Sequence, residues 1–379
     1  MHIIFLSADT GGGHRASAEA LAKQFLIQYP GSTYELIDVW SEHGVLPYRT
    51  LVNTYKRMSA NPFEWRIFYH LSNTKLNEVC ANIHSRITSG KAIKKRLQSS
   101  KPDCIISVHP TMNHTPLKAT NRISKELGIH IPFYTVVTDL GSGHCMWFER
   151  NVDKLYVASD RLYNLARKRG GTAPEDIVQT GLPIRHGFAI QNQKLMGDRT
   201  SKEGLEYQLS IRQQLKVIPD INKQCILIMG GGEGVGSLSQ IVHELYISLT
   251  TNNIDATICV VCGRNEKLQT ELLEKYKDYD FDLDSLSDDI PQGRFRLVTK
   301  LKRKIFNRRR KNGDDSSSTS SSDSKSKSRG NVDIVPLGFL TNIPEYMVAA
   351  DILVSKAGPG TIAEAAAVGL PVMMTRYVI

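Results

Sequence analysis

The sequence predicts an α/β fold of two lobes, each built on a doubly wound parallel sheet. Apolar runs of strand length alternate with segments of helical period, a pattern typical of parallel α/β layers. Three glycine-rich turns, at 11–13, 230–234 and 358–360, each follow such a run within a few residues. A chain of 379 residues is also long enough to bury two separate cores.

The expected strands fall into two groups. In the first half of the chain the apolar runs are 3–6, 34–39, 104–108, 133–137 and 154–157, and in the second half 225–229, 256–261, 332–336, 352–354 and 371–374. We expect a first lobe over 1–190, a polar linker over 191–215 and a second lobe over 216–379. Ligands of such sheets bind at the carboxyl ends of the strands, where the glycine turns lie.

The positive charge is concentrated in one segment. The formal net charge is +10, yet eight Lys and Arg residues lie between 300 and 311 without an acidic residue, so the remainder is nearly balanced and does not indicate nucleic-acid binding. The serine-rich tract that follows cannot bury enough apolar surface to fold, and we expect 299–330 to be a disordered insertion. It either attracts anionic lipid headgroups or is a tolerated surface loop.

Composition also limits the class of protein. No apolar stretch approaches the length that crosses a bilayer, and the first residues form a strand-like run without a basic leader. A targeting segment, if the protein enters an organelle, is then absent from this sequence. Six cysteines in so long a chain do not form a disulfide framework, which favours a reducing compartment.

The glycine turns favour a phosphorylated ligand, and the first of them also carries a titratable residue. Such a turn between a strand and a helix exposes backbone N–H groups, and a helix N-terminus favours negative charge. His14 follows the glycines at 11–13, where the helix N-terminus disfavours imidazolium. We expect a neutral His14 that accepts a proton near pH 7. The structural alternative is a histidine that packs on its helix or caps it.

Six segments together resemble the monogalactosyldiacylglycerol synthase family: residues 9–17, 107–110, 138–140, 229–234, 262–265 and 356–364. The resemblance covers nearly the whole chain except the insertion. The family consists of plastid-envelope glycosyltransferases of family 28, related to the bacterial enzyme that adds N-acetylglucosamine to lipid I. It implies the GT-B fold, in which two Rossmann-like lobes enclose the active site in the cleft between them.

By this resemblance the chain is a 1,2-diacylglycerol 3-beta-galactosyltransferase. Galactose moves from UDP-galactose to the free hydroxyl of 1,2-diacylglycerol with inversion to a β-linkage, and His14 is the catalytic base. The first lobe binds the acceptor, and the residues expected to do so are Gly12, Gly13, His109, Asp139 and Trp147.

The resemblance assigns UDP-sugar binding mainly to the second lobe. Backbone groups and a helix dipole hold the diphosphate, so neither a metal nor another cofactor is expected. Glu364 accepts hydrogen bonds from the ribose, although Thr361 and Glu364 also have the spacing of a capping box. Arg185 reaches the nucleotide from the first lobe or makes only a hinge contact. The full expected set is Arg185, Gly231, Gly232, Arg264, Gly338, Phe339, Leu340, Thr341, Lys356, Gly358, Pro359, Gly360, Thr361 and Glu364.

Aromatic residues of the first half allow two interpretations. Trp147 and Phe148 either insert into the bilayer interface, where indole rings are favoured, or belong to the core. Trp40, Pro47 and Trp65 lie in a region that, by resemblance, is a membrane-facing flap.

Four further patterns are interpreted as having no metal-binding, redox or cofactor-binding role. Cys259 and Cys262 lie three apart on an expected strand with no second pair, which indicates core residues. The acidic run 278–284 is interpreted as a solvated charge run and not as a metal-binding Asp-x-Asp motif. His109 and His114 lack the spacing of a metal pair. The first glycine turn lacks the Gly-x-Gly-x-x-Gly spacing of dinucleotide oxidoreductases.

The family continues past 369–371 through a sugar-contacting loop and closing helices, whereas this sequence ends at Ile379, so we expect a truncated C-terminal end. Two other functions stay open: a glucosyltransferase that uses UDP-glucose with the same acceptor, and an inactive module that binds UDP-sugar or lipid.

The family places the protein peripherally on the plastid (chloroplast) envelope, in contact with diacylglycerol and an anionic lipid surface, alone or as a homodimer.

Overall fold

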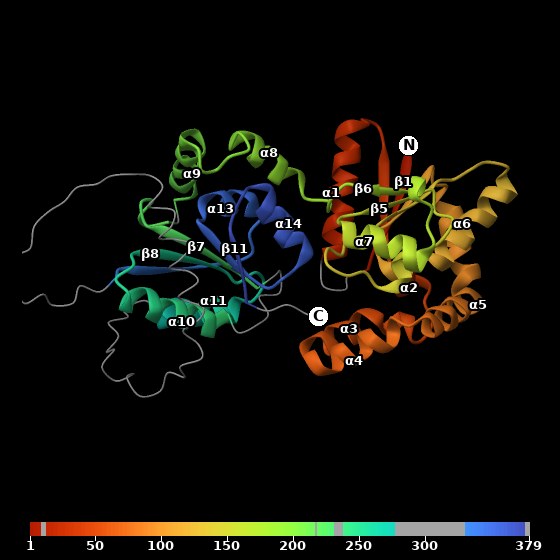
Figure 1. Ribbon diagram of the computed structural model, residues 1–379, viewed down its shortest axis with the longest axis horizontal. Coiled ribbons are helices and arrows are strands. Elements are labelled where there is room, and N and C mark those ends of the chain that lie inside the picture. Colours follow the sequence, from red (N-terminus) through yellow and green to blue (C-terminus); the bar gives the residue numbers. More distant parts are fainter. Residues whose placement is uncertain (9–12, 217, 231–237, 277–329, 376–379) are drawn as a thin grey trace, which may run out of the picture. The chain divides into compact units, whose positions relative to one another are not determined.

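The computed structural model describes residues 1–8, 13–216, 218–230, 238–276 and 330–375, which form two compact units (Figure 1). The first unit is Met1–Arg199 together with Ala357–Gly369 and the described residues 374–375. The second is Thr200–Lys356 together with Leu370–Met373. Each is built on one parallel sheet, which confirms the predicted pair of doubly wound α/β lobes.

The sheet of the first unit has the order β2-β1-β3-β4-β5-β6. Its strands are β1 (His2–Leu6), β2 (Thr33–Ile37), β3 (Cys104–Ser107), β4 (Phe133–Val136), β5 (Lys154–Val157) and β6 (Ile177–Gln179). All neighbours pair in parallel, with Leu6 opposite both Ile37 and Ser107. The carboxyl ends of the strands therefore share one edge of the sheet.

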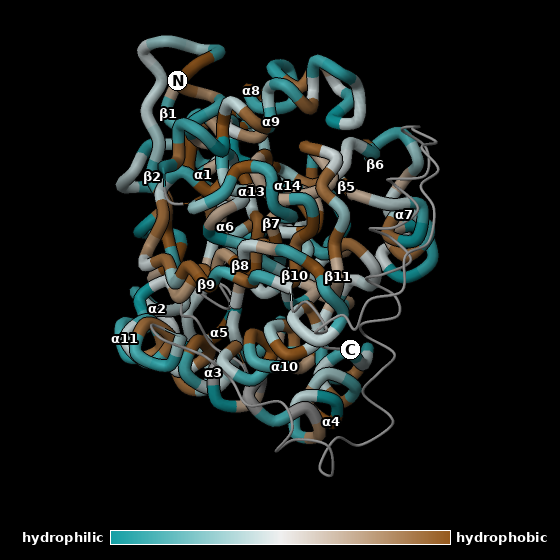
Figure 2. The backbone as a smooth tube through the Cα atoms, turned by 90° about the vertical axis from the view of Figure 1, so that its left-hand side faces the viewer, coloured by the Kyte–Doolittle hydropathy of each residue, from teal (hydrophilic) through white to brown (hydrophobic). Residues whose placement is uncertain are grey.

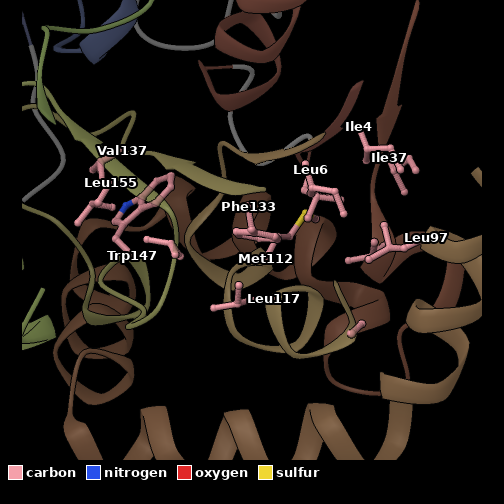
Figure 3. Close-up of a cluster of buried hydrophobic side chains, with 14 of the residues drawn as sticks. Ile4, Leu6, Ile37, Leu97, Met112, Leu117, Phe133, Val137, Trp147 and Leu155 are labelled. Carbon is pink, nitrogen blue, oxygen red and sulfur yellow. The ribbon is translucent and has the colours of Figure 1, made fainter. Parts of the chain in front are cut away.

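Alternate residues of β1 enter two different cores, one on each face of this sheet. Ile4 and Leu6 pack into a cluster with Phe133 and Trp147, whereas Phe5 packs into another. Figure 3 shows part of the first cluster, with Trp147 close to Val137 and Leu155. Because both faces are covered, the strands are nearly continuous apolar runs, which is why the sequence revealed them.

Helices connect these strands and cover the sheet. They are α1 (Gly13–Gln28), α2 (Val39–His43), α3 (Leu51–Ala60), α4 (Pro62–Ser72), α5 (Lys75–Ser100), α6 (His114–Leu127), α7 (Asp160–Leu165) and α8 (His186–Lys194), with α14 (Pro359–Ala367) packed on α1 and α8. Figure 1 shows α3, α4 and α5 together along one side of the first unit. Short 3-10 turns at Pro110–Met112 and Cys145–Trp147 follow β3 and β4.

The sheet of the second unit has the order β11-β10-β7-β8-β9. Its strands are β7 (Gln224–Met229), β8 (Ala256–Val261), β9 (Val332–Leu337), β10 (Ile352–Ser355) and β11 (Val372–Met374), and the helices of this unit are α9 (Lys202–Leu215), α10 (Leu238–Thr251), α11 (Glu266–Lys275) and α13 (Ile343–Ala349). Ser355 lies opposite Met229, which lies opposite Val261. The central strands β7 and β8 are brown in Figure 2 because their side chains are almost all apolar.

Three features differ from the expectation. The strand expected over 34–39 ends at Ile37, because Asp38 caps α2 by accepting the amides of Trp40 and Ser41 at 3.0 and 3.1 Å. Edge strand β6 was not expected, since three residues are too few to show a period. The predicted linker contains α9, whose buried Arg212 donates to the Ala349 carbonyl at 2.8 Å and thereby fixes the helix to the second unit.

Candidate functional site

Both predicted sites lie at the topological switch point of a sheet. The chain order reverses between neighbouring β1 and β3 in the first sheet, and between β7 and β10 in the second. Ligands of open parallel sheets bind beside such a point, at the carboxyl ends of the strands. His14 and His109 come after β1 and β3, while Gly230 and Lys356 come directly after β7 and β10.

His14 lies in the first turn of α1 and is only partly exposed. Its Nδ1 is 2.6 Å from Oγ1 of Thr138, which follows β4. Burial lowers the pKa of His14 to about 4, although a hydrogen bond to the Val108 backbone acts in the opposite direction. The structure thus supports the expected neutral imidazole, but its main cause is burial and not the helix N-terminus.

His109 packs edge-on against His14, with ring centroids 4.7 Å apart. The Thr111 hydroxyl is 3.0 Å from Nδ1 of His109, and the Thr111 amide donates to the same nitrogen at 3.4 Å. Nε1 of Trp40 donates to that hydroxyl at 2.9 Å. Burial, followed by the charges of His14 and His144, holds the pKa of His109 well below its usual value, so both imidazoles are neutral at pH 7.

Asp139 and Trp147 form a pair beside His14. The Trp147 Nε1 donates to Oδ2 of Asp139 at 2.6 Å, and the indole lies 5.9 Å from the His14 ring. Burial raises the pKa of Asp139 to about 6, while the indole hydrogen bond lowers it. The Trp147 side chain is fully buried, and its contact with the acceptor stays a prediction. The indole N–H of Trp147 holds the Asp139 carboxylate in place.

The expected membrane-facing aromatics are corrected in part. Trp40, Trp147 and Phe148 belong to the core, and Trp65 is half-buried against Tyr55. Other side chains form an exposed apolar face instead, at helical spacing along α4 and α5. This apolar face consists of Phe63, Ile67, Leu71, Leu76, Val79, Ile83 and Ile87. No helix in the described part of the chain is both long and apolar enough to cross a bilayer.

The apolar face lies among basic residues. The segment 51–100 contains nine Lys and Arg residues but only two Glu residues. Arg57 is exposed on α3, Arg66 on α4, and Arg86 and Lys91 on α5. The sequence analysis missed this concentration because it followed the larger basic run at 300–311.

In the second unit, the register brings the predicted donor-binding loops to one edge. Val261 lies opposite both Met229 and Leu337, so the loops after β7, β8 and β9 begin side by side. Exposed Lys356 follows β10 at the same edge. The Arg264 guanidinium lies 5.5 Å from the ring centroid of Phe339, which is 59% exposed. Gly338 and Leu340 flank that ring, and Thr341 is exposed beside them.

Arg185 and Glu364 form a bidentate ion pair within the first unit. Nε of Arg185 donates to Oε1 of Glu364 at 2.6 Å, and Nη2 donates to Oε2 at 2.8 Å. Glu364 is buried, whereas the Arg185 side chain is 41% exposed and also contacts Phe188 through a cation–π interaction. The Glu364 carboxylate thus fixes the Arg185 guanidinium. This geometry is compatible with a contact that only holds the hinge and with nucleotide binding, so both alternatives for Arg185 stay open.

The capping-box alternative for Thr361 and Glu364 is wrong. Helix α14 begins at Pro359 with Gly358 as its N-cap and no side-chain cap, so Thr361 lies inside the first turn. A Cβ added at Gly360 would meet no described atom within 4 Å, and the same holds for Gly13 at the start of α1. Neither glycine has a positive φ. Packing and backbone conformation therefore give no reason for glycine at these two helix starts.

Several predictions lie outside the described residues. These are Gly12, Gly231, Gly232, the acidic run 278–284 and the insertion 299–330 except its last residue. Cys259 and Cys262 are confirmed as core residues. Nδ1 of His114 lies 2.9 Å from Oε2 of Glu149, within hydrogen-bond distance. Among the described residues, no group of three or more His, Cys, Asp or Glu side chains is arranged to hold a metal ion.

Comparison with known proteins identifies both halves of the chain. Residues 14–184 match the family model of monogalactosyldiacylglycerol (MGDG) synthase, and residues 282–375 match the C-terminal domain of glycosyltransferase family 28. Monogalactosyldiacylglycerol synthase 1, chloroplastic, of Arabidopsis thaliana is 29% identical and covers 99% of this chain. Synthase 3 of the same plant is 31% identical, and the Spinacia oleracea enzyme 30%, each over 99% of the chain.

The chain spans 58%, 66% and 59% of the lengths of these three relatives. Among solved structures, MurG of Acinetobacter baumannii is 16% identical over 96% of this chain and 74% of its own, with a TM-score of 0.45. A glycosyltransferase from Rickettsia africae is 14% identical over 100% of this chain and 80% of its own, with a TM-score of 0.43. From its two matched models and its curated relatives, the chain belongs to the monogalactosyldiacylglycerol synthase family.

Proposed function

We propose that this chain carries a 1,2-diacylglycerol 3-beta-galactosyltransferase activity, which moves galactose from UDP-galactose to diacylglycerol with inversion. The observation that carries the proposal is the neutral, partly exposed His14 at the switch point of the first sheet, within the part that matches the MGDG synthase model. A single inverting displacement needs a base that takes the proton of the attacking hydroxyl. A neutral imidazole can do so at pH 7.

The acceptor hydroxyl then meets His14 at the edge of the first sheet. The free hydroxyl of diacylglycerol attacks the anomeric carbon of galactose, His14 accepts the hydroxyl proton, and UDP leaves with the bonding electrons. Among the described residues, no atom lies within 4 Å of a Cβ added at Gly13, which fits a ligand that approaches the backbone closely beside His14. His109 and Asp139 line the same edge as neutral and weakly acidic groups.

UDP binding is assigned to glycine-rich and basic elements. The N-terminus of α14 offers N–H groups and its dipole to the diphosphate, with Gly360 open for close approach. Lys356 adds a positive charge, and the exposed ring of Phe339 with Arg264 offers a stacking surface for uracil. These groups neutralise the diphosphate without a metal ion in our proposal.

Glu364 can still accept hydrogen bonds from the ribose hydroxyls, because its carboxylate oxygens have lone pairs that Arg185 does not use. Each carboxylate oxygen accepts one bond from Arg185 and retains a second lone pair for a ribose hydroxyl. Arg185 then fixes the orientation of the Glu364 carboxyl group, so the pair acts as one unit in nucleotide binding.

The lipid acceptor requires contact with a membrane, and the apolar face is proposed to supply it. Apolar side chains on α4 and α5 enter the headgroup region while the surrounding Lys and Arg residues attract anionic lipids, each contributing about 1 kcal/mol. The relatives are named chloroplastic, and we place this protein peripherally on the plastid envelope.

A vesicle assay tests attachment. Replacing Leu71, Leu76 and Ile87 by Ser should reduce sedimentation with vesicles of phosphatidylglycerol and neutral lipid at least several-fold, without changing UDP affinity. The control replaces exposed Leu127, Ile129 and Met196, outside the apolar face, by Ser. Equal binding by both triple variants would exclude this face as the attachment site.

The function itself is tested by incubating the full chain with diacylglycerol vesicles and radiolabelled UDP-galactose or UDP-glucose. We expect labelled monogalactosyldiacylglycerol, preference for UDP-galactose, and unchanged turnover in the presence of a chelator. Preference for UDP-glucose would identify a glucosyltransferase. UDP binding without transfer from either donor would identify an inactive binding module.

A further inference from the structure

Thr138 holds one nitrogen of His14. Its side chain is buried, and Oγ1 lies 2.6 Å from Nδ1 of His14 and 3.5 Å from the carbonyl oxygen of Val108. Thr138 follows directly after Val137, whose amide donates to the Tyr156 carbonyl at 2.9 Å. The sheet therefore fixes the backbone from which the Thr138 side chain projects.

The direction of these bonds follows from what each group can do. A carbonyl oxygen only accepts, so the Thr138 hydroxyl hydrogen points toward Val108. The hydroxyl oxygen then receives a hydrogen from Nδ1 of His14. A neutral imidazole carries one hydrogen, which leaves the lone pair on Nε2.

We propose that Thr138 is a positioning residue that fixes His14 in the Nδ1–H tautomer and so leaves Nε2 to accept the proton of the acceptor hydroxyl. This inference rests on the proposed role of His14 as the base. Without Thr138, the imidazole exchanges its hydrogen between the two nitrogens and rotates about χ2, and a smaller fraction of molecules presents a basic nitrogen to the acceptor.

The neighbouring His109 is held in the opposite form. The indole Nε1 of Trp40 only donates, so the Thr111 hydroxyl accepts from it and turns its own hydrogen to Nδ1 of His109, where the Thr111 amide also donates. His109 therefore carries its hydrogen on Nε2. Two rings 4.7 Å apart thus have opposite tautomers, each fixed by its own threonine.

Spectroscopy of the full chain tests the tautomers without relying on activity. Long-range ¹H–¹⁵N correlation spectra of protein labelled with ¹⁵N-histidine should show Nδ1–H for His14 and Nε2–H for His109, with signals assigned by loss in His14→Gln and His109→Gln. In Thr138→Val, the His14 signal should shift toward a mixture of tautomers while that of His109 stays. An Nε2–H signal for His14 in the unmodified chain would overturn the proposal.

Kinetics test the consequence for catalysis. Thr138→Val should lower kcat roughly 10- to 100-fold, less than the roughly 10²- to 10⁴-fold contribution of a general base, and leave KM for both substrates within about twofold. Thr138→Ser, which keeps the hydroxyl, should restore kcat to within about threefold. Thr111→Val, the matched control, should leave the His14 tautomer unchanged. Full kcat in a folded Thr138→Val protein would contradict the positioning role.

Two outcomes separate this inference from the proposed function. If His14→Ala retains full transfer, the role of His14 as base fails, and the positioning role of Thr138 in catalysis fails with it, even where the spectra show the expected tautomer. If His14→Ala is inactive but Thr138→Val is fully active, only the positioning role fails. Should Thr138→Val not fold, Thr138→Ser and the spectra of the unmodified chain still decide the question.

Discussion

The carboxyl edges of the two sheets have the same topology but opposite chemistry. At the first, His14, His109 and Asp139 are packed together, and burial shifts the pKa of each toward its neutral form. At the second, the corresponding positions carry glycine, an exposed Lys356 and the exposed Arg264–Phe339 pair. On the proposed function, the two buried histidines at the first edge would exchange protons, whereas the exposed cations, ring and amides at the second edge would bind an anionic nucleotide. On that proposal, the same topology serves proton transfer in one unit and ligand binding in the other.

The largest effect should follow from changing the base. His14→Ala is expected to lower kcat roughly 10²- to 10⁴-fold with little change in UDP affinity, because the imidazole acts on the acceptor proton and not on the nucleotide. Steady-state galactosyl transfer and calorimetric titration with UDP measure the two quantities. His130→Ala, at an exposed histidine of the same unit, should match the unmodified chain. A parallel loss of UDP affinity would show that the two edges are not chemically separate.

Acid should destabilise the first unit. The folded pKa of His14 and of His144 is about 4, below the unfolded value of 6.5, so the stability from their neutral forms is complete above 6.5 and lost as pH falls through 4. We expect about 2–3 kcal/mol of this loss to come from His14. Urea unfolding of the chain and of His14→Gln at pH 7 and pH 4.5 measures it. An equal loss in both proteins would contradict the buried neutral state.

Removing the positive charge of Lys356 from the carboxyl edge of the second unit's sheet should weaken nucleotide binding. Lys356→Ala is expected to weaken UDP binding roughly tenfold, the cost of one charged hydrogen bond, with a smaller effect on UMP. Calorimetric titration compares it with Lys267→Ala, an exposed lysine on α11. Equal UDP affinities in the two variants would exclude Lys356 from the diphosphate site.

The smallest effect concerns Asp139. Its folded pKa of about 6 lies above the unfolded value of 3.8, so ionisation costs stability above pH 6 and nothing below 3.8. Asp139→Asn keeps an acceptor for the Trp147 indole and should stabilise the protein by about 1–2 kcal/mol at pH 7. The gain should shrink as pH falls toward 4. Thermal unfolding of both proteins at pH 7 and pH 4 measures the gain. A gain of the same size at both pH values would contradict the raised pKa.

The expected strands were found because the parallel sheets are covered on both faces. Most of the runs are almost entirely apolar, and each of the ten expected runs overlaps a strand. The exception, β6, has one buried residue of three and no apolar run. The end of β2 was misplaced although its signal was present, since Asp38 precedes a turn of helix and caps it.

The sequence indicates which residue types could form a site, but it does not show which of them are buried. A histidine after glycines indicates a candidate base, and that role stays a prediction. Trp147 and Trp40 have the composition of interfacial residues, yet both are core side chains that donate hydrogen bonds to Asp139 and Thr111. The apolar face on α4 and α5 went unnoticed, because a helix stripe exposed to solvent and one packed on a core have the same period.

By itself, the sequence determined two parallel α/β sheets, the glycine turns at their carboxyl ends and a histidine beside the first turn, because these depend on local composition and spacing. Only the tertiary structure decided which nitrogen of His14 is held, which aromatic rings are buried and that Glu364 pairs with Arg185 instead of capping α14. Those features join residues more than a hundred positions apart, or depend on solvent access, and no local pattern encodes either.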